Sequence, residues 1–265
     1  MTIFKQELRA NLKNTIMWIC VLNGIMILFM SFYPTISSDI DNFMKLMENF
    51  PPEMKAVFGI ATQNFASAIG FYSFVFVYIS LFAAIQAMNL GIGIVSKESR
   101  ERTADFLMTK PVSRIKILTS KILAVFTLLI ITNVIYSTFS SLMVSGFSEQ
   151  GFEVKKFILI NASMFFTQLI FFSIGLIVSI ALKKVRSVLS ISLGLVFMFY
   201  AISAFAVTSK DDKLRFITPF QYFKTDYILT QSQYESMYAI IGIFIVVISI
   251  IISYILYKRK DIHAT

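Results

Sequence analysis

Six long apolar stretches divide the chain, and short polar or charged segments separate them. These stretches cover residues 15–33, 65–95, 122–144, 157–182, 187–207 and 236–257. At 1.5 Å of rise per residue, each is about long enough to cross a hydrocarbon core of roughly 30 Å as a helix. The pattern therefore predicts an all-α integral membrane protein with six transmembrane helices.

Lys and Arg residues gather in alternate connecting segments. The two termini and the segments after the second and fourth stretches hold 16 Lys or Arg and 5 Asp or Glu, whereas the other segments hold 8 and 10. Segments rich in Lys and Arg stay on the cytoplasmic side of a membrane. Both termini are therefore expected in the cytoplasm. The net charge of +9 follows this loop pattern, so it does not indicate a nucleic-acid partner.

Residues 1–14 precede the first stretch and read as an amphipathic helix. Phe4, Leu8 and Leu12 recur at a spacing of four, while Lys5 and Lys13 point elsewhere. We expect this helix to lie in the headgroup plane, ahead of a membrane domain at residues 15–265.

The most strongly charged segment is 96–121, between the second and third stretches, with seven basic and three acidic residues. Thr103 can cap a helix that has Asp105 in its first turn. Pro111 should end that helix, and Ser113 can cap a second helix that leads into the next stretch. A short helix held between two spans gives a soluble partner something to bind. The alternative is a solvated loop whose basic residues only fix topology.

This segment follows a familiar pattern, in which a Glu precedes Gly-Thr-Leu-Glu, two leucines, Pro-Val-Ser-Arg and a later Lys. The matching residues are Glu98, Thr103, Asp105, Phe106, Leu107, Met108, Pro111, Val112, Ser113, Arg114 and Lys121. The segment thereby resembles the cytoplasmic loop of type-2 ATP-binding-cassette (ABC) permeases, which carries the coupling helix that docks on the ATPase. The chain departs from the pattern at Arg102 and Ala104.

A second, looser match lies between the fifth and sixth stretches, where the family often has Pro-Phe and nearby aromatic residues. Pro219-Phe220 and Tyr222-Phe223 resemble this pattern. The resemblance implies a partly re-entrant segment, whose irregular backbone must be shielded by protein.

The resemblance implies the membrane subunit of an ABC exporter in a bacterial plasma membrane. Its partners would be two copies of an ABC ATPase, membrane lipid, and a second copy of itself or a homologous permease. ATP and Mg would bind the ATPase, so this chain alone would not be an enzyme. The residues expected to contact the ATPase are Glu98, Glu101, Thr103, Asp105, Phe106, Leu107 and Arg114. Family analogy suggests a hydrophobic or amphipathic cargo, such as a peptide, an antibiotic or a lipid.

No cofactor or metal site is expected from the sequence. Gly91 and Gly93 superficially suggest a phosphate loop, but the spacing G-x-x-x-x-G-K-[ST] is lacking. Close packing of helices at small residues is the better interpretation. His263 is the sole histidine and Cys20 the sole cysteine, and the two are not at the sequence spacing of metal ligands.

The six stretches contain no Asp, Glu, Lys, Arg or His, the residues that ion-driven transporters commonly use to load a proton or cation. Proton coupling is therefore not expected, and energy for uphill transport should come from another subunit; the alternative is coupling to sodium through backbone carbonyls. Their neutral polar residues are Asn23, Gln86, Asn89, Asn133, Asn161 and Gln168. These either hydrogen-bond between helices or line a translocation path.

Aromatic residues are dense in the second and fourth stretches. They are Phe71, Phe74, Tyr78, Phe82, Phe165, Phe166, Phe171 and Phe172. They either line an adaptable cleft for cargo or, as we expect, face lipid. A different kind of function also fits the sequence: a membrane scaffold or sensor whose basic loop recruits a soluble partner and transports nothing.

Overall fold

The computed structural model describes residues 2–51, 54–55, 65–100, 113–148, 151–182, 184–209 and 212–259. Within them, six helices are long and apolar enough to cross a membrane, and each contains an 18-residue window of mean hydropathy 2.1 or more. They are α1 (Thr2–Met30), α5 (Ala68–Arg100), α7 (Arg114–Phe147), α8 (Val154–Ala181), α9 (Val188–Ser209) and α12 (Ser236–Arg259). The prediction of an all-α protein with six spans is confirmed.

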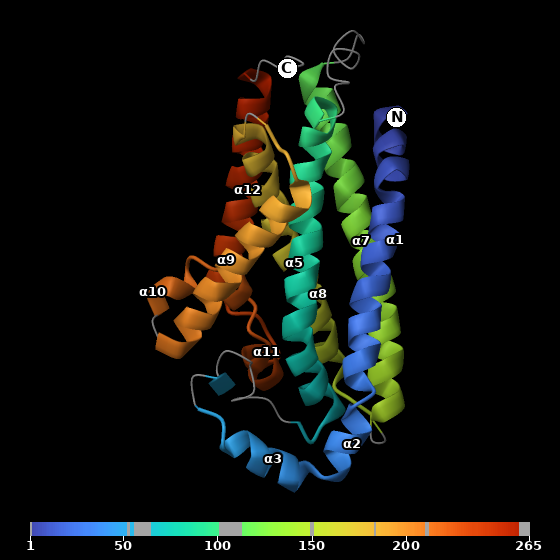
Figure 1. The fold of residues 1–265 in the computed structure, drawn as a ribbon, viewed down its shortest axis with the longest axis vertical. Coiled ribbons are helices and arrows are strands. Elements are labelled where there is room, and N and C mark those ends of the chain that lie inside the picture. Colours follow the sequence, from blue (N-terminus) through green and yellow to red (C-terminus); the bar gives the residue numbers. More distant parts are fainter. Residues whose placement is uncertain are drawn as a thin grey trace.

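The six helices form one bundle, in which α1 begins and α12 ends at the same end (Figure 1). The end of α5 and the start of α7 lie there too. We call this the cytoplasmic end, after the orientation predicted from the sequence, and the opposite end the outer end.

Helices α5 and α8 form the centre of the bundle and pack closely at two glycines. A Cβ atom on Gly91 would lie 2.4 Å from the carbonyl oxygen of Phe172, and one on Gly175 would lie 2.9 Å from that of Met88. Neither position has room for a larger residue, so the backbones approach closely here. The helix-packing interpretation is therefore confirmed at Gly91 but not at Gly93, where an added Cβ atom would lie 3.8 Å from Val188.

The expected interfacial helix at residues 1–14 is not a separate element, because α1 runs unbroken from Thr2 to Met30. In this part the buried side chain is that of Glu7, followed by Thr15 just beyond it, whereas Leu12 is exposed. In a membrane bundle the apolar side can face lipid while polar side chains face protein, so the apolar stripe did not mark the buried side.

The segment 96–121 differs from the prediction at its start and agrees with it at its end. Helix α5 continues to Arg100, beyond the predicted end of its span at residue 95, and α7 begins at Arg114. Ser113 caps α7 as predicted, since its hydroxyl accepts a hydrogen bond from the Lys116 N–H at 3.4 Å. The predicted short helix after Thr103 lies outside the described residues.

The outer end carries short helices. Helices α2 (Tyr33–Ser38) and α3 (Ile40–Glu48) follow α1, and α10 (Asp212–Arg215), the 3₁₀ turn η1 (Pro219–Gln221) and α11 (Thr225–Gln231) connect α9 to α12. In the second group the chain turns back into the bundle. The Thr218 hydroxyl donates to the carbonyl of Phe199, midway along α9, at 2.8 Å, and the rings of Phe220 and Phe171 lie 4.9 Å apart. These contacts place the turn beside the middle of α9 and against α8, and re-entry into a membrane stays a prediction.

Several aromatic residues lie deeper than expected. Phe71, Phe171 and Phe172 are at most 2% exposed and belong to the packed cores of the bundle. The expectation that they face lipid is wrong, because α5 and α8 are central helices with little outward surface.

Candidate functional site

The residues expected to contact an ATPase lie at the cytoplasmic end or beyond the described ranges. Glu98 belongs to α5, but its side chain is not among those described. Glu101, Thr103, Asp105, Phe106 and Leu107 fall outside the described residues. Arg114 opens α7, and its Nη1 donates to the carbonyl of Lys258, near the end of α12, at 3.1 Å. This contact links the start of α7 to α12.

A buried ion pair lies just inside that end of the bundle. Lys121 of α7 is fully buried, and its Nζ lies 3.1 Å from Oε1 of Glu7 in α1. The same Nζ donates to the carbonyl of Ile94 in α5 at 2.6 Å. One ammonium group therefore joins three helices. The sequence analysis placed Lys121 in a loop and did not single out Glu7. A signal was present, because Glu7 is the one acidic residue in the first 14, which also contain three basic residues.

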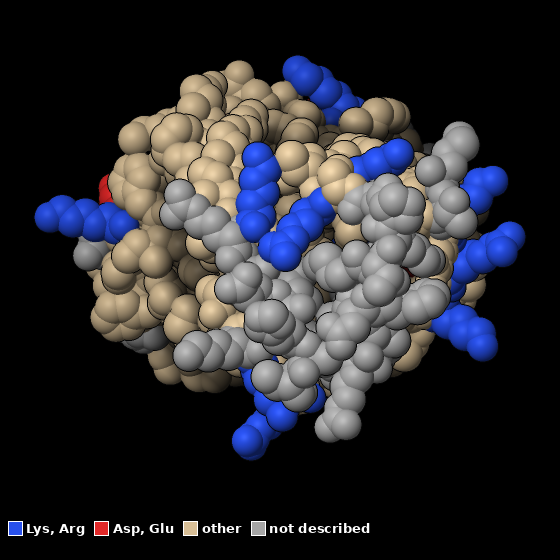
Figure 2. Space-filling model, turned by 90° about the horizontal axis from the view of Figure 1, so that it is seen from above, with Lys and Arg blue, Asp and Glu red and all other residues tan. Residues whose placement is uncertain are grey.

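Around this pair the cytoplasmic end is basic. Figure 2 shows Lys and Arg side chains distributed around this face. The exposed ones among the described residues include Lys5, Arg9 and Lys13 of α1 and Lys116 of α7. Such a rim suits an acidic surface, whether lipid headgroups or a protein.

A neutral hydrogen-bonded network joins α5, α7 and α8 deeper in the bundle. Gln168 Nε2 donates to Gln86 Oε1 at 3.1 Å, and Gln86 Nε2 donates to the Thr132 hydroxyl at 3.0 Å. Asn133 Nδ2 donates to Gln168 Oε1 and to the carbonyl of Leu129. Three of the six predicted polar residues are thus brought together, in the interhelical bonding expected of them.

A second network joins the same three helices nearer the outer end. The Tyr72 hydroxyl donates to Asn161 Oδ1 at 2.9 Å and lies 3.2 Å from the Tyr136 hydroxyl. The Ser140 hydroxyl lies 3.4 Å from the same Asn161 oxygen. Sequence reasoning found Asn161 but not Tyr72 or Tyr136. A signal was available, because a tyrosine inside an apolar stretch needs a partner for its hydroxyl.

The other two predicted polar residues stand apart from these networks. Asn23 is buried and donates to the carbonyl of Ile19 in its own helix at 2.8 Å. Asn89 is half-buried one turn from Gln86. A role in a translocation path stays a prediction for all six.

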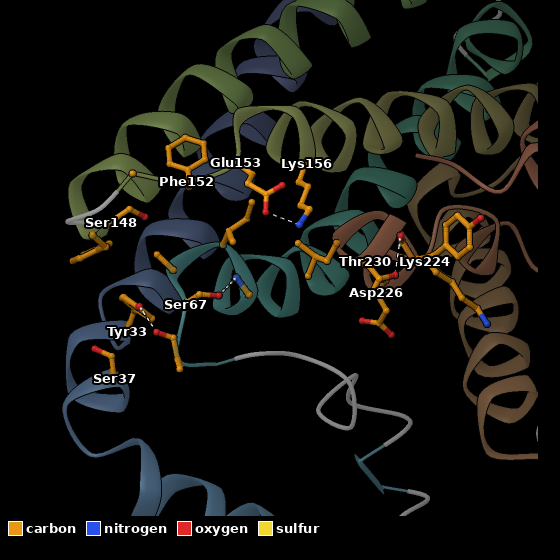
Figure 3. A pocket seen from close by; sticks show the side chains of 18 of the residues that line it. Tyr33, Ser37, Ser67, Ser148, Phe152, Glu153, Lys156, Lys224, Asp226 and Thr230 are labelled. Atoms are coloured by element: carbon orange, nitrogen blue, oxygen red, sulfur yellow. Dashed lines mark hydrogen bonds and ion pairs between the residues drawn. The ribbon is translucent and has the colours of Figure 1, made fainter. Parts of the chain in front are cut away.

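The outer end contains a cavity of about 1310 Å³ that the sequence analysis did not foresee. Its walls come from Tyr33 of α2, the start of α5, the end of α7, the start of α8, and α11 (Figure 3). Lys156 and Glu153 form an ion pair of 2.6 Å on one side. Lys224 lies on another side, and burial together with the charge of Arg215 lowers its pKa. An amphipathic ligand would find both charged and aromatic surface here.

Over the described ranges, no three His, Cys, Asp or Glu side chains are grouped to hold a metal ion. The polar clusters of the bundle instead hold helices together and present a basic end.

Comparison with known families decides what kind of bundle this is. Residues 1–262 match the family described as ABC-2 family transporter protein. The chain belongs to the ABC-2 transporter family. A comparison with curated proteins gave no match. The resemblance seen in the sequence is thereby confirmed, and it extends over nearly the whole chain.

An ABC-2 permease is a multi-pass membrane subunit that associates with an ABC ATPase and is not itself the ATPase. In this ABC-2 permease, the loop expected to meet that partner joins α5 to α7. The buried Glu7–Lys121 pair lies between the same two helices and α1. The permease therefore combines a basic end, a buried ion pair beneath it and a neutral interior.

Proposed function

We propose that this ABC-2 permease is the membrane subunit of an ABC exporter that moves a hydrophobic or amphipathic cargo outward. Two permeases, identical or homologous, would pair and bind two ATPase subunits at the cytoplasmic end in a bacterial plasma membrane. The observation that carries the proposal is the family match over residues 1–262 of a six-helix bundle.

In this proposal the loop between α5 and α7 receives the ATPase. Closure of the ATPase around ATP and Mg would push on Phe106 and Leu107 and on the charged residues beside them. Such a push drives transport only if the two conformations of the permease bind the ATP-loaded partner with different affinities. The bundle would then alternate between a state open to the cytoplasm and one that releases cargo outside.

The interior supports a cargo with little charge. Residues 14–38 of the first candidate span, and the corresponding central parts of the other five, contain no Asp, Glu, Lys, Arg or His. The neutral network at Gln86 and Gln168 offers hydrogen bonds without a fixed charge. The outer cavity would give the polar part of an amphipathic cargo a place at release. A peptide, an antibiotic or a lipid fits these properties.

Copurification with the ATPase tests the proposal. Phe106→Asp, or deletion of residues 103–108, should abolish assembly with the ATPase while the spans still insert, because a carboxylate cannot replace an apolar docking residue. Phe50→Asp makes the same change at an exposed phenylalanine of the outer end and should leave assembly intact. Normal ATP-driven transport by the Phe106 variants would refute the proposed docking.

Movement of cargo distinguishes an exporter from a scaffold or sensor. Inverted vesicles that contain the permease and its ATPase should accumulate cargo when ATP is added. A complex that assembles through the loop but moves none of a panel of peptides, antibiotics and fluorescent lipids would point to the scaffold instead.

A further inference from the structure

The cytoplasmic end contains a charged contact that the proposed docking of an ATPase does not use. Lys121 is fully buried, and Glu7 is only 6% exposed. The ammonium group of Lys121 contacts the Glu7 carboxylate and the carbonyl of Ile94. Three helices therefore meet at one cation, and one of them, α1, is far from the other two in the sequence.

Stability alone does not account for this pair. Removing two charges from water costs several kcal/mol per ion, and apolar residues of similar volume often replace such a pair without loss. The pair is also imperfectly satisfied, because Oε2 of Glu7 accepts no hydrogen bond from any described residue. What a buried pair does provide is a defined position for each helix, since neither charge can leave the other without a large penalty.

The position of the pair relative to the loop is informative. Lys121 lies seven residues after the start of α7, and Ile94 lies six residues before the end of α5. At 1.5 Å per residue, each is roughly 10 Å from the point where its helix meets the loop. A displacement of the loop therefore reaches Lys121 and Ile94 through two short, rigid helical segments. Glu7 adds α1 to the same contact.

We propose that Glu7 and Lys121 are positioning residues that make α1 move as one body with the helical ends of α5 and α7. The inference rests on the proposed function for its role in transport, because it assigns the path by which a push on the loop reaches α1. The contact itself does not depend on that function and can be tested without an ATPase.

The first experiment uses the permease alone in detergent. Glu7→Gln removes the carboxylate charge that lies beside the buried Lys121 cation and should lower the thermal midpoint by several degrees. Adding Lys121→Met should then cost less stability than it does in the wild type, because the contact between the two residues is already lost. Lys116→Met removes an exposed cation from the same end of α7 and serves as the control. Additive effects of Glu7→Gln and Lys121→Met would overturn the proposal.

The second measurement reports position rather than stability. Spin labels on cysteines at Leu12 of α1 and Leu123 of α7, both exposed, can be placed after Cys20→Ser removes the sole native cysteine. Glu7→Gln and the double variant should both broaden the distance distribution between the labels. Lys121→Arg, which keeps a cation, should retain a narrow one. Unchanged distributions in all variants would contradict a positioning role.

The third measurement concerns transport by the complex with the ATPase. The double variant should copurify with the ATPase and hydrolyse ATP, but cargo moved per ATP should fall about tenfold, as expected when two sites lose their coupling. The single variant Lys121→Arg, which keeps a cation beside Glu7, should retain most of the cargo moved per ATP. Full transport by the double variant would overturn the coupling role. If even the wild type fails to transport while the first two experiments succeed, the proposed function fails and the positioning pair stands.

Discussion

At the scale of single residues, the neutral polar side chains are the most informative part of the interior. Within a membrane bundle, no water is present to hydrogen-bond an amide that lacks a protein partner. Gln86 of α5 and Gln168 of α8 are hydrogen-bonded to each other, and Gln168 also accepts a hydrogen bond from Asn133 of α7. The network therefore fixes the relative register of three helices.

Replacing Gln168 should show how much this network contributes. Gln168→Leu removes the link between Asn133 and Gln86 and should destabilise the permease by about 1–2 kcal/mol. The measurement is thermal or denaturant unfolding in detergent, followed by the intrinsic fluorescence of Trp18. Asn89→Leu makes a comparable change on α5 outside the network, and its effect should be smaller. Equal losses of stability in both variants would show that the network does not stabilise the permease more than a single polar residue outside it.

Residues of this kind could be found from the sequence only where they break its apolar pattern. Asn161 was recognised because an amide stands out in a run of hydrocarbon. Tyr72 and Tyr136 were missed because tyrosine also occurs in aromatic belts and apolar cores. Glu7 and Lys121 were missed because spans were delimited by their charges, whereas the helices continue beyond the apolar stretches.

At the scale of helices, the number of spans was predictable and their ends were not. Each span contains an apolar run long enough to cross the membrane, and this signal is strong. The polar start of α1 was assigned to a separate helix, yet no Gly or Pro interrupts the chain before Gly24. With nothing to break it, the helix continues into the span. The depth reached by the turn at Pro219 depends on tertiary contacts such as Thr218 with Phe199, which local patterns do not encode.

Glycine substitutions test the close crossing of α5 and α8. Gly91→Ala would place a methyl group 2.4 Å from the Phe172 carbonyl oxygen, so the two helices must separate. We expect a loss of about 1–3 kcal/mol of stability, as for other overpacked sites. Gly93→Ala is the matched control, because its added methyl would lie 3.8 Å from Val188. Both changes raise helix propensity equally. A thermal midpoint for Gly91→Ala at or above that of Gly93→Ala would contradict a tight crossing.

The segment between α9 and α12 offers a second test at this scale. Arg215 forms an ion pair with Glu235, donates to the carbonyl of Gln221 at 3.1 Å and lies over the ring of Tyr238. Glu235→Gln should weaken the hold on residues 212–235 by about 1.5–3 kcal/mol, because Arg215 is mostly buried. Faster amide hydrogen exchange confined to this segment is the expected result.

A second ion pair at the outer end provides the control for that experiment. Glu153, which pairs with Lys156, has a side chain that is 66% exposed. Exposed pairs contribute little, so Glu153→Gln should leave hydrogen exchange almost unchanged. Similar exchange in the two variants would mean that Arg215 does not anchor the segment.

At the scale of the whole molecule, the bundle exposes many large apolar side chains on its outer helices. Helix α12 exposes Met237, Ile240, Phe244 and Ile251, and α9 exposes Phe197 and Phe205. These helices suit contact with lipid or with a second permease. The buried charges described here, Glu7, Lys121 and Arg215, lie near the two ends of the bundle, where Arg215 pairs with the half-buried Glu235. Its middle is held by neutral hydrogen bonds.

This distribution of charge makes a prediction about the energy source. A carrier driven by protons or cations needs a group at membrane depth that binds and releases the ion, usually a carboxylate or a histidine. The central parts of the six spans contain none, so ATP should be the energy source. In inverted vesicles with the permease and its ATPase, cargo accumulation should require ATP and persist when ionophores dissipate the proton and sodium gradients. Accumulation by the permease alone, driven by an imposed ion gradient without nucleotide, would contradict ATP as the energy source.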